Sequence, residues 1–168
     1  MTFETVGRQE LREQAERLCG LYQSTSAEEV LTAAITDEFA GRIALVSSFG
    51  SEAAVLLHMV SRIDPYVPVV FEQLIRDFGL CSVHVVTPHP DAVIAEDPKG
   101  VLHATNPDRC CHVRKTIPML QALRGHKCWI TGRKRYQSGT RKELFQFETQ
   151  DGKIKLNPLA NWDVEMVS

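Results

Sequence analysis

The stretch RIALVSSFGSEAAVLLHMVSRI, residues 42–63, places a short apolar run, a turn of small residues and an apolar-faced segment in immediate succession. The first part is typical of a buried strand, and the last has its apolar residues at helical spacing. Strand–loop–helix units of this kind build parallel sheets that helices cover. The stretch therefore predicts an α/β fold.

The sequence on either side repeats this alternation. We predict strands in YVPVVF (66–71), SVHVVTP (82–88) and KCWITG (127–132), and a helix near 108–124 that ends at Gly125. Two helices precede the sheet, and Ser26 with Glu29 predicts a capping box at the start of the second. The result is a mostly parallel sheet with helices on both faces. The period-two pattern around Asp151 and Gly152 predicts an antiparallel hairpin added to it.

Composition limits the class of protein. A chain of 168 residues with 43% hydrophobic residues is enough for one domain spanning 1–168, with N-terminal helices at about 8–40 and an α/β core at about 42–168. A formal net charge of −2 argues against a general nucleic-acid or membrane-surface binder. There is no apolar leader and no membrane-length apolar run, so we expect a cytoplasmic protein. Oligomeric state is left open, and a homo-oligomer is compatible with the sequence.

The turn after the first core strand is a candidate phosphate loop. Ligands of open α/β sheets bind beyond the carboxyl ends of the strands, where helix N-termini attract anions. Glycine lets the backbone approach a ligand, and the serine hydroxyls can donate to phosphate or sulfate oxygens. An ordinary strand-to-helix turn is the alternative, because the stretch matches neither the Walker A nor the Rossmann glycine pattern. The candidate residues are Ser47, Ser48, Phe49, Gly50, Ser51 and Glu52.

GRKRYQSGTR, residues 132–141, follows the strand at 127–132 and forms a basic loop. Arginine binds anions bidentately, so several cations at a strand's carboxyl end suggest a multiply charged ligand. The alternatives are a solvated charge run or a nucleic-acid patch. The candidate ligand-binding residues are Arg133, Lys134, Arg135, Gln137, Thr140 and Arg141.

DRCCHVRK, residues 108–115, crowds two thiols and several cations together. Adjacent cysteines make a poor disulfide and a poor zinc site, whereas iron–sulfur clusters tolerate them more readily. Arg114 and Lys115 each follow one of the cysteines by four residues, which favours thiolate on the same helix face. The sequence leaves two readings open for Cys110 and Cys111: ligands of a metal or cluster, or incidental residues at a helix start. We expect core roles for the remaining thiols, Cys19, Cys81 and Cys128.

Together, SSFGSEAAVLLHMVS, CCHVRK, WITGRKRYQSGTR and KIKLNPLANW resemble the assimilatory sulfonucleotide reductases, from about Ala44 to the end. The resemblance implies an adenine-nucleotide α-hydrolase-like fold, with a modified pyrophosphate loop at residues 47–52 and the basic loop at 132–141. The double cysteine resembles the iron–sulfur branch, which mostly reduces adenosine 5′-phosphosulfate. It implies that Cys110 and Cys111 are two of four [4Fe–4S] ligands. It also implies that Lys115 links the cluster to the substrate sulfate and acts in catalysis.

The reaction that the resemblance implies belongs to sulfate assimilation and cysteine biosynthesis. A cysteine thiolate attacks the sulfate sulfur, AMP leaves and an enzyme S-sulfocysteine forms. Thioredoxin or glutaredoxin then releases sulfite. The alternatives are reduction of the 3′-phosphorylated substrate, an ATP pyrophosphatase of the same fold, and an inactive nucleotide-binding module. The loop carries Phe49 and Glu52 where a pyrophosphatase has Ser-Gly-Gly-x-Asp, which argues against the second alternative.

Three family elements are missing. The Asp-Thr-Gly turn expected after Phe71 is absent, and only about ten residues separate Phe71 from the strand at Ser82, the lower limit for a parallel crossover. The second cysteine pair and the nucleophilic cysteine are expected beyond Ser168. We therefore expect that the 168 residues alone are inactive and belong to a longer protein.

Overall fold

In the computed structural model, which describes residues 3–47, 53–70, 81–84, 86–137 and 143–163, the strands form one sheet. The strands are β1 (Ile43–Val46), β2 (Val69–Val70), β3 (Val83–His84), β4 (Cys128–Ile130), β5 (Phe147–Gln150) and β6 (Lys153–Leu156). Their order is β3-β2-β1-β4-β6-β5. All described pairs are parallel except β5 with β6. The predicted α/β class with a mostly parallel sheet is confirmed.

The predicted N-terminal helices are α1 (Phe3–Leu21) and α2 (Ala27–Ala33), and α2 continues into a π-helical turn, η1 (Ala34–Glu38). The capping box at Ser26 is confirmed. The Ser26 hydroxyl accepts a hydrogen bond from the Glu29 N–H at 3.3 Å, and the Ser26 N–H donates to the Glu29 carboxylate at 2.9 Å. Two donors at the helix start are thereby satisfied.

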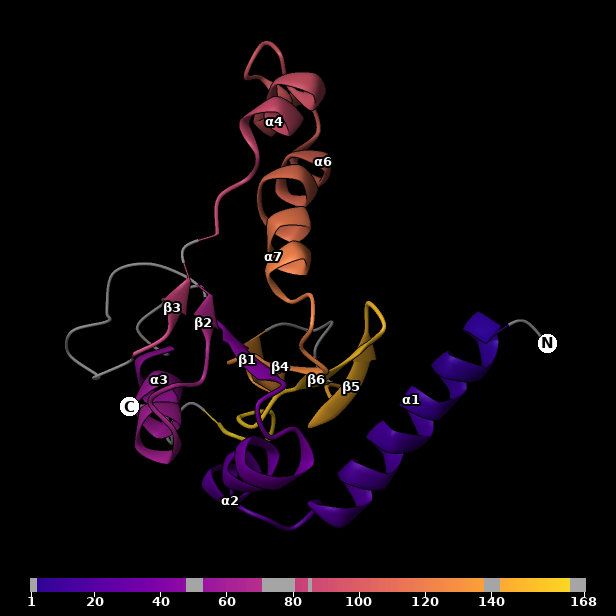
Figure 1. Cartoon of the computed structure of the whole chain (residues 1–168), viewed down its shortest axis with the longest axis vertical. Coiled ribbons are helices and arrows are strands. Elements are labelled where there is room, and N and C mark those ends of the chain that lie inside the picture. Colours follow the sequence, from indigo (N-terminus) through magenta and orange to yellow (C-terminus); the bar gives the residue numbers. More distant parts are fainter. Residues whose placement is uncertain (1–2, 48–52, 71–80, 85, 138–142, 164–168) are drawn as a thin grey trace.

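The main core lies between α1, α2, α3 (Ala53–Ile63) and one face of the sheet (Figure 1). Its fully buried side chains include Leu18, Leu31, Leu57, Ile130 and Ile154. On the opposite face, Ala44 and Trp129 pack with Leu123 in a smaller cluster. Helices therefore contact both faces, as predicted, but much more extensively on one.

A column of short helices projects from the sheet (Figure 1). It consists of α4 (Pro90–Glu96), α5 (Leu102–Thr105), α6 (Pro107–Cys111), the π-helical turn η2 (His112–Thr116) and α7 (Ile117–Ala122). The predicted helix near 108–124 is confirmed as the α6–η2–α7 run, which ends before Gly125 at φ 87°. The sequence did not predict α4 and α5. Each is too short for a clear apolar period, and although α4 begins with His89 as its cap and Pro90, the N-cap position of α5 is Val101, whose side chain caps nothing.

The predicted hairpin is also confirmed. Asp151 and Gly152 have φ values of 51° and 71°, and Gln150 pairs with Lys153 across this two-residue turn. Positive φ at both central positions suits the twist of paired strands, which is why Asp-Gly is favoured there. Because β6 pairs parallel with β4, only the edge strand β5 runs antiparallel.

The short crossover noted in the sequence joins β2 to β3, which are parallel neighbours. The position expected for the missing Asp-Thr-Gly turn, just after Phe71, lies outside the described residues. Among the helices that the structure does describe, none has the length and apolar character needed to cross a membrane.

Candidate functional site

Two predicted ligand loops leave the sheet side by side. β1 and β4 are parallel neighbours, so Ser47 after β1 and Thr131 to Lys134 after β4 start from the same edge of the sheet. This is the edge at which open α/β sheets bind ligands. Several predicted residues lie outside the described part of the chain: Ser48, Phe49, Gly50, Ser51, Glu52, Thr140 and Arg141. Gln137 ends the 3₁₀ turn η3 (Arg135–Gln137).

Asn157 anchors the start of the basic loop. Its buried side-chain oxygen accepts a hydrogen bond from the Thr131 hydroxyl at 2.6 Å, and its amide nitrogen donates to the Phe145 carbonyl at 2.9 Å. The same nitrogen donates to the Glu148 carboxylate at 3.0 Å. One fully buried side chain thus ties the exit of β4 to the hairpin. Buried networks of this kind fix a backbone in one conformation. We did not single out Asn157 from the sequence, and its place at a strand end before a proline was the only signal.

The cations of the basic loop have different surroundings. Arg133 is exposed, whereas the Lys134 side chain is fully buried at the base of the loop. The Arg135 Nε donates to the Leu144 carbonyl at 2.8 Å, which fixes that guanidinium against the segment leading into β5. The structure therefore brings Arg133 and Arg135 to the surface of this edge and Lys134 beneath it.

The cysteine pair lies at the end of α6. Cys110 is half-buried and Cys111 is exposed. The Arg114 guanidinium donates to the Cys110 sulfur at 3.5 Å, so the predicted contact between residues four apart is present. Lys115 is exposed on η2, close in sequence to both thiols.

Asp97 holds Arg114 in place. Its carboxylate accepts from Arg114 Nη2 at 2.8 Å and from the Leu102 N–H at 3.0 Å, and only 3% of its side chain is exposed. Burial alone would raise the pKa of Asp97, but these hydrogen bonds and the guanidinium charge bring the pKa below its ordinary value. The chain Asp97–Arg114–Cys110 thus links the end of α4 to the cysteine pair. The sequence did not reveal Asp97, because its partner is distant along the chain.

We expect Asp97→Asn to lower the melting temperature at pH 7. A carboxylate with a depressed pKa stabilises the fold above its unfolded pKa, and this contribution is lost as the pH falls through the folded value. The difference from the wild type should therefore shrink below about pH 4. Differential scanning calorimetry from pH 3 to 7 measures it. Glu96→Gln is the matched control, because the exposed Glu96–Arg109 pair should contribute little. An equal loss in both variants, or one independent of pH, would argue against a special role for Asp97.

The donor chemistry of the site fits part of a cluster. Two neighbouring thiols beside a cation suit two thiolate ligands. Within the described ranges, however, no three His, Cys, Asp or Glu side chains gather as metal ligands would. Cys110 and Cys111 therefore offer two ligands, and the described part of the chain does not complete the set.

The other three cysteines, Cys19, Cys81 and Cys128, do not all have the core role that we predicted for them. Cys128 is buried, and burial raises its pKa strongly. Cys19 packs at the edge of the core, donates to the Phe147 carbonyl at 3.3 Å, and has a pKa raised mainly by burial. The core role predicted for Cys81 is wrong, because Cys81 is exposed. It lies just before β3 at the edge of the sheet, where its N–H bonds the Pro65 carbonyl.

The rate of alkylation should distinguish the exposed cysteines from the buried ones. Thiolate fraction and access both control thiol reactivity. We expect iodoacetamide to modify Cys81 and Cys111 first, and Cys19 and Cys128 only after denaturant is added. Peptide mass spectrometry over a time course measures the order. Modification of Cys128 in the native protein as fast as Cys111 would contradict the packing described here.

Comparison with known proteins places residues 42–168 within the sequence profile of the family described as the phosphoadenosine phosphosulfate reductase domain. An adenosine 5′-phosphosulfate reductase of Mesorhizobium japonicum is 39% identical over 159 residues, which cover 86% of this chain and 63% of that protein. The reductase of the same name from Chelativorans sp. is also 39% identical, with 84% of this chain and 64% of the relative covered. The chain thus spans less than two thirds of the length of these relatives.

Two further similarities are informative. A phosphoadenosine 5′-phosphosulfate reductase of Gloeobacter violaceus is 30% identical, covering 90% of this chain and 70% of that protein. The crystal structure of a phosphoadenylyl-sulfate reductase from Candida auris, in a phosphate complex, superposes with a TM-score of 0.69 at 23% identity, covering 92% of this chain and 82% of that one. At that identity the structural likeness supports the fold alone.

Proposed function

Because the chain belongs to the phosphoadenosine phosphosulfate reductase domain family, we propose that it is part of an enzyme that reduces adenosine 5′-phosphosulfate to sulfite and AMP. The observation that carries the proposal is the common origin of the Ser47 loop and the basic loop at the carboxyl ends of β1 and β4. Two relatives at 39% identity that bear the name of this activity support the choice of substrate. We also propose that the enzyme acts in the cytoplasm.

In this proposal the phosphosulfate lies between the two loops. The serine loop, residues 47–52, faces the phosphate through backbone N–H groups and hydroxyls. Arg133 and Arg135, which are exposed at this edge, pair with the anionic groups, together with Gln137, Thr140 and Arg141. Lys134 is fully buried beneath the loop and packs under these exposed cations.

The chemical step transfers a sulfo group. We assign the attack to a thiolate of the complete enzyme outside these 168 residues. That thiolate forms a sulfur–sulfur bond to the sulfate sulfur, while the bond to the phosphate oxygen breaks and AMP leaves. A dithiol such as thioredoxin then supplies two electrons, becomes a disulfide, frees sulfite and restores the cysteine. Lys115 would offset the repulsion between the thiolate and the sulfo group.

The cysteine pair is assigned to a [4Fe–4S] cluster, for which Cys110 and Cys111 would be two of the four ligands. A bound cluster would place a fixed charge and polarisable sulfur beside Lys115. Arg114, which already contacts the Cys110 sulfur at 3.5 Å, would favour the thiolate and offset the negative charge of the site. Asp97 keeps that guanidinium in position.

Reduction of the 3′-phosphorylated nucleotide is the second candidate. The 30% identical relative from Gloeobacter violaceus bears that name, and the family description does too. The two substrates differ by one phosphate on the ribose, so a cation facing that position decides between them.

Isothermal titration of the full-length gene product with both sulfonucleotides and with ATP tests the proposed site. We expect adenosine 5′-phosphosulfate to bind at least about tenfold more tightly than ATP, and Arg133→Ala to weaken it. Lys99→Ala, at an exposed position in the turn between α4 and α5, is the matched control and should bind normally. Tight ATP binding with release of pyrophosphate would instead indicate an adenylating enzyme.

A further inference from the structure

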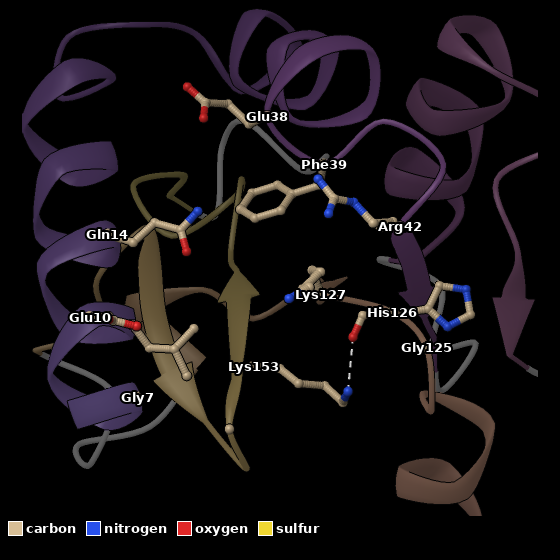
Figure 2. Close-up of a pocket in the computed structure, with 12 residues that line it drawn as sticks. Gly7, Glu10, Gln14, Glu38, Phe39, Arg42, Gly125, His126, Lys127 and Lys153 are labelled. Atoms are coloured by element: carbon tan, nitrogen blue, oxygen red, sulfur yellow. Dashed lines mark hydrogen bonds between the residues drawn. The ribbon is translucent and has the colours of Figure 1, made fainter. Parts of the chain in front are cut away.

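A cleft of about 600 Å³ opens at the amino ends of the strands, the end of the sheet opposite the serine loop and the basic loop. It lies between α1, the residues that enter β1 and β4, and the turn of the hairpin (Figure 2). Arg42 precedes β1, and Lys127 precedes β4. Its volume is within the usual range of pockets that hold small molecules. Because it faces the amino ends of the strands, it is separate from the proposed sulfonucleotide site.

One side of the cleft is basic. Arg42 and Lys127 are exposed, and neither forms an ion pair with any residue that the structure describes. The Lys127 N–H donates to the Arg42 carbonyl at 2.8 Å, which keeps the two residues next to each other. The Lys153 ammonium donates to the His126 carbonyl at 2.8 Å and stays on the same side (Figure 2).

The acidic residues of the cleft do not balance these cations. Glu38 is bound by the Arg17 guanidinium at 2.9 Å and by the Tyr22 hydroxyl at 3.4 Å, so its charge is largely satisfied. Glu10 lies on α1, across the cleft from Arg42 (Figure 2). The basic side therefore keeps a local excess of positive charge in a chain of net charge −2.

The lining also has an apolar part. Leu11 is half-buried at the wall of the cleft, so a ligand with a hydrocarbon or aromatic body gains contact area there, whereas Phe39 is only 2% exposed and supports that wall from within the core. His126 Nδ1 is buried and has no hydrogen-bond partner among the described residues. Buried polar atoms are normally satisfied by protein, water or a bound ion. Because His126 Nδ1 is closed off from solvent, it does not face the open cleft, and the inference rests on the cations and Leu11 instead.

We propose that this cleft binds a small organic anion. Its carboxylate, phosphate or sulfate group pairs with Arg42, Lys127 and Lys153, and its apolar body contacts Leu11. The geometry resembles that of many small-molecule sites, in which a few convergent polar groups fix the ligand above an apolar surface. The inference is independent of the activity proposed above, because none of these residues belongs to either ligand loop.

Amide NMR titration tests the cleft directly. Phenyl phosphate and inorganic phosphate serve as probes, with sodium chloride at matched ionic strength as the blank. We expect saturable shifts at residues 125–127 and 152–153, with phenyl phosphate binding more tightly than phosphate. Arg42→Gln with Lys127→Gln should weaken binding at least about tenfold, because two charge-assisted hydrogen bonds are lost. Lys99→Gln, remote in the α4–α5 turn, should leave it unchanged.

Three outcomes of the NMR titration would overturn the proposal. Shifts no larger than those with sodium chloride, or equal affinity in the double variant, would overturn the proposal. Shifts confined to Ser47 and Gly132 would locate the anion at the other edge, which would support the sulfonucleotide site and reject this one. The replaced side chains are exposed, and the dispersion of the variant's spectrum reports its fold. If the double variant does not fold, the single variants should each bind about threefold more weakly.

Discussion

Lys115→Ala in the full-length enzyme should lower kcat for sulfite release by about a hundredfold or more, with the fold intact. The expected loss is of the size seen when one preorganised donor to a developing charge is removed. The side chain is exposed on η2, so its removal should change the free energy of unfolding by no more than about 0.5 kcal/mol. Steady-state sulfite assays and urea titrations of the same preparation measure the two quantities separately.

The control for Lys115 is another exposed lysine of the same helical column. Lys99→Ala removes the same charge in the turn between α4 and α5 and should retain wild-type turnover. Lys115→Arg keeps the charge but changes its shape, and we expect partial activity. Turnover of Lys115→Ala within twofold of the wild type would remove Lys115 from the mechanism.

Cys110→Ser and Cys111→Ser, each made in the full-length protein, should abolish the broad visible absorbance of anaerobically purified enzyme. A serine oxygen is a much poorer ligand than thiolate for iron, and the loss of one ligand of four leaves the cluster open to solvent. We expect iron content to fall several-fold and sulfite release to become undetectable. Absorbance near 400 nm, iron analysis and the sulfite assay follow the three effects.

Cys81→Ser is the matched control for these two variants, because Cys81 is also exposed and lies outside the cysteine pair. It should keep both the absorbance and the iron. If all three variants retain iron equally, Cys110 and Cys111 are not ligands. If all three lose it equally, the loss reflects handling and the comparison supports no assignment to the pair.

The elements with a strong local signal were predicted well. Residues 42–63 contain β1 and α3, because a β-rich apolar run followed by an amphipathic segment is compatible with few secondary structures other than a strand and a helix. The capping box at Ser26 and the Asp-Gly turn also depend on neighbours within a few residues. All the residues that form these features lie within a few positions of one another, so the prediction needed no tertiary information.

The features that were missed depend on contacts between distant residues. Asp97 gains its role from Arg114, and Asn157 gains its role from Thr131 and Phe145. The sequence around a polar residue does not reveal which distant residue will form its hydrogen bond in the folded protein. The short helices α4 and α5 were missed because helices of seven and four residues are too short to show an apolar period.

Cys81 was assigned to the core because free cysteine is commonly buried, and its place at the edge of the sheet overrode that tendency. The ligand loops could be assigned to one edge from the sequence, since parallel neighbouring strands end together. Their detailed contacts could not, because they depend on how each loop folds over the sheet.

Anaerobic assay of the full-length gene product with adenosine 5′-phosphosulfate and reduced thioredoxin tests whether the chain is part of a sulfonucleotide-reducing enzyme. Sulfite and AMP should appear in equal amounts, and sulfite should appear faster than it does from the 3′-phosphorylated nucleotide. Faster release from the 3′-phosphorylated substrate would reverse the substrate assignment. No sulfite from either nucleotide, in a preparation that binds both, would contradict the proposal that this chain belongs to a sulfonucleotide-reducing enzyme.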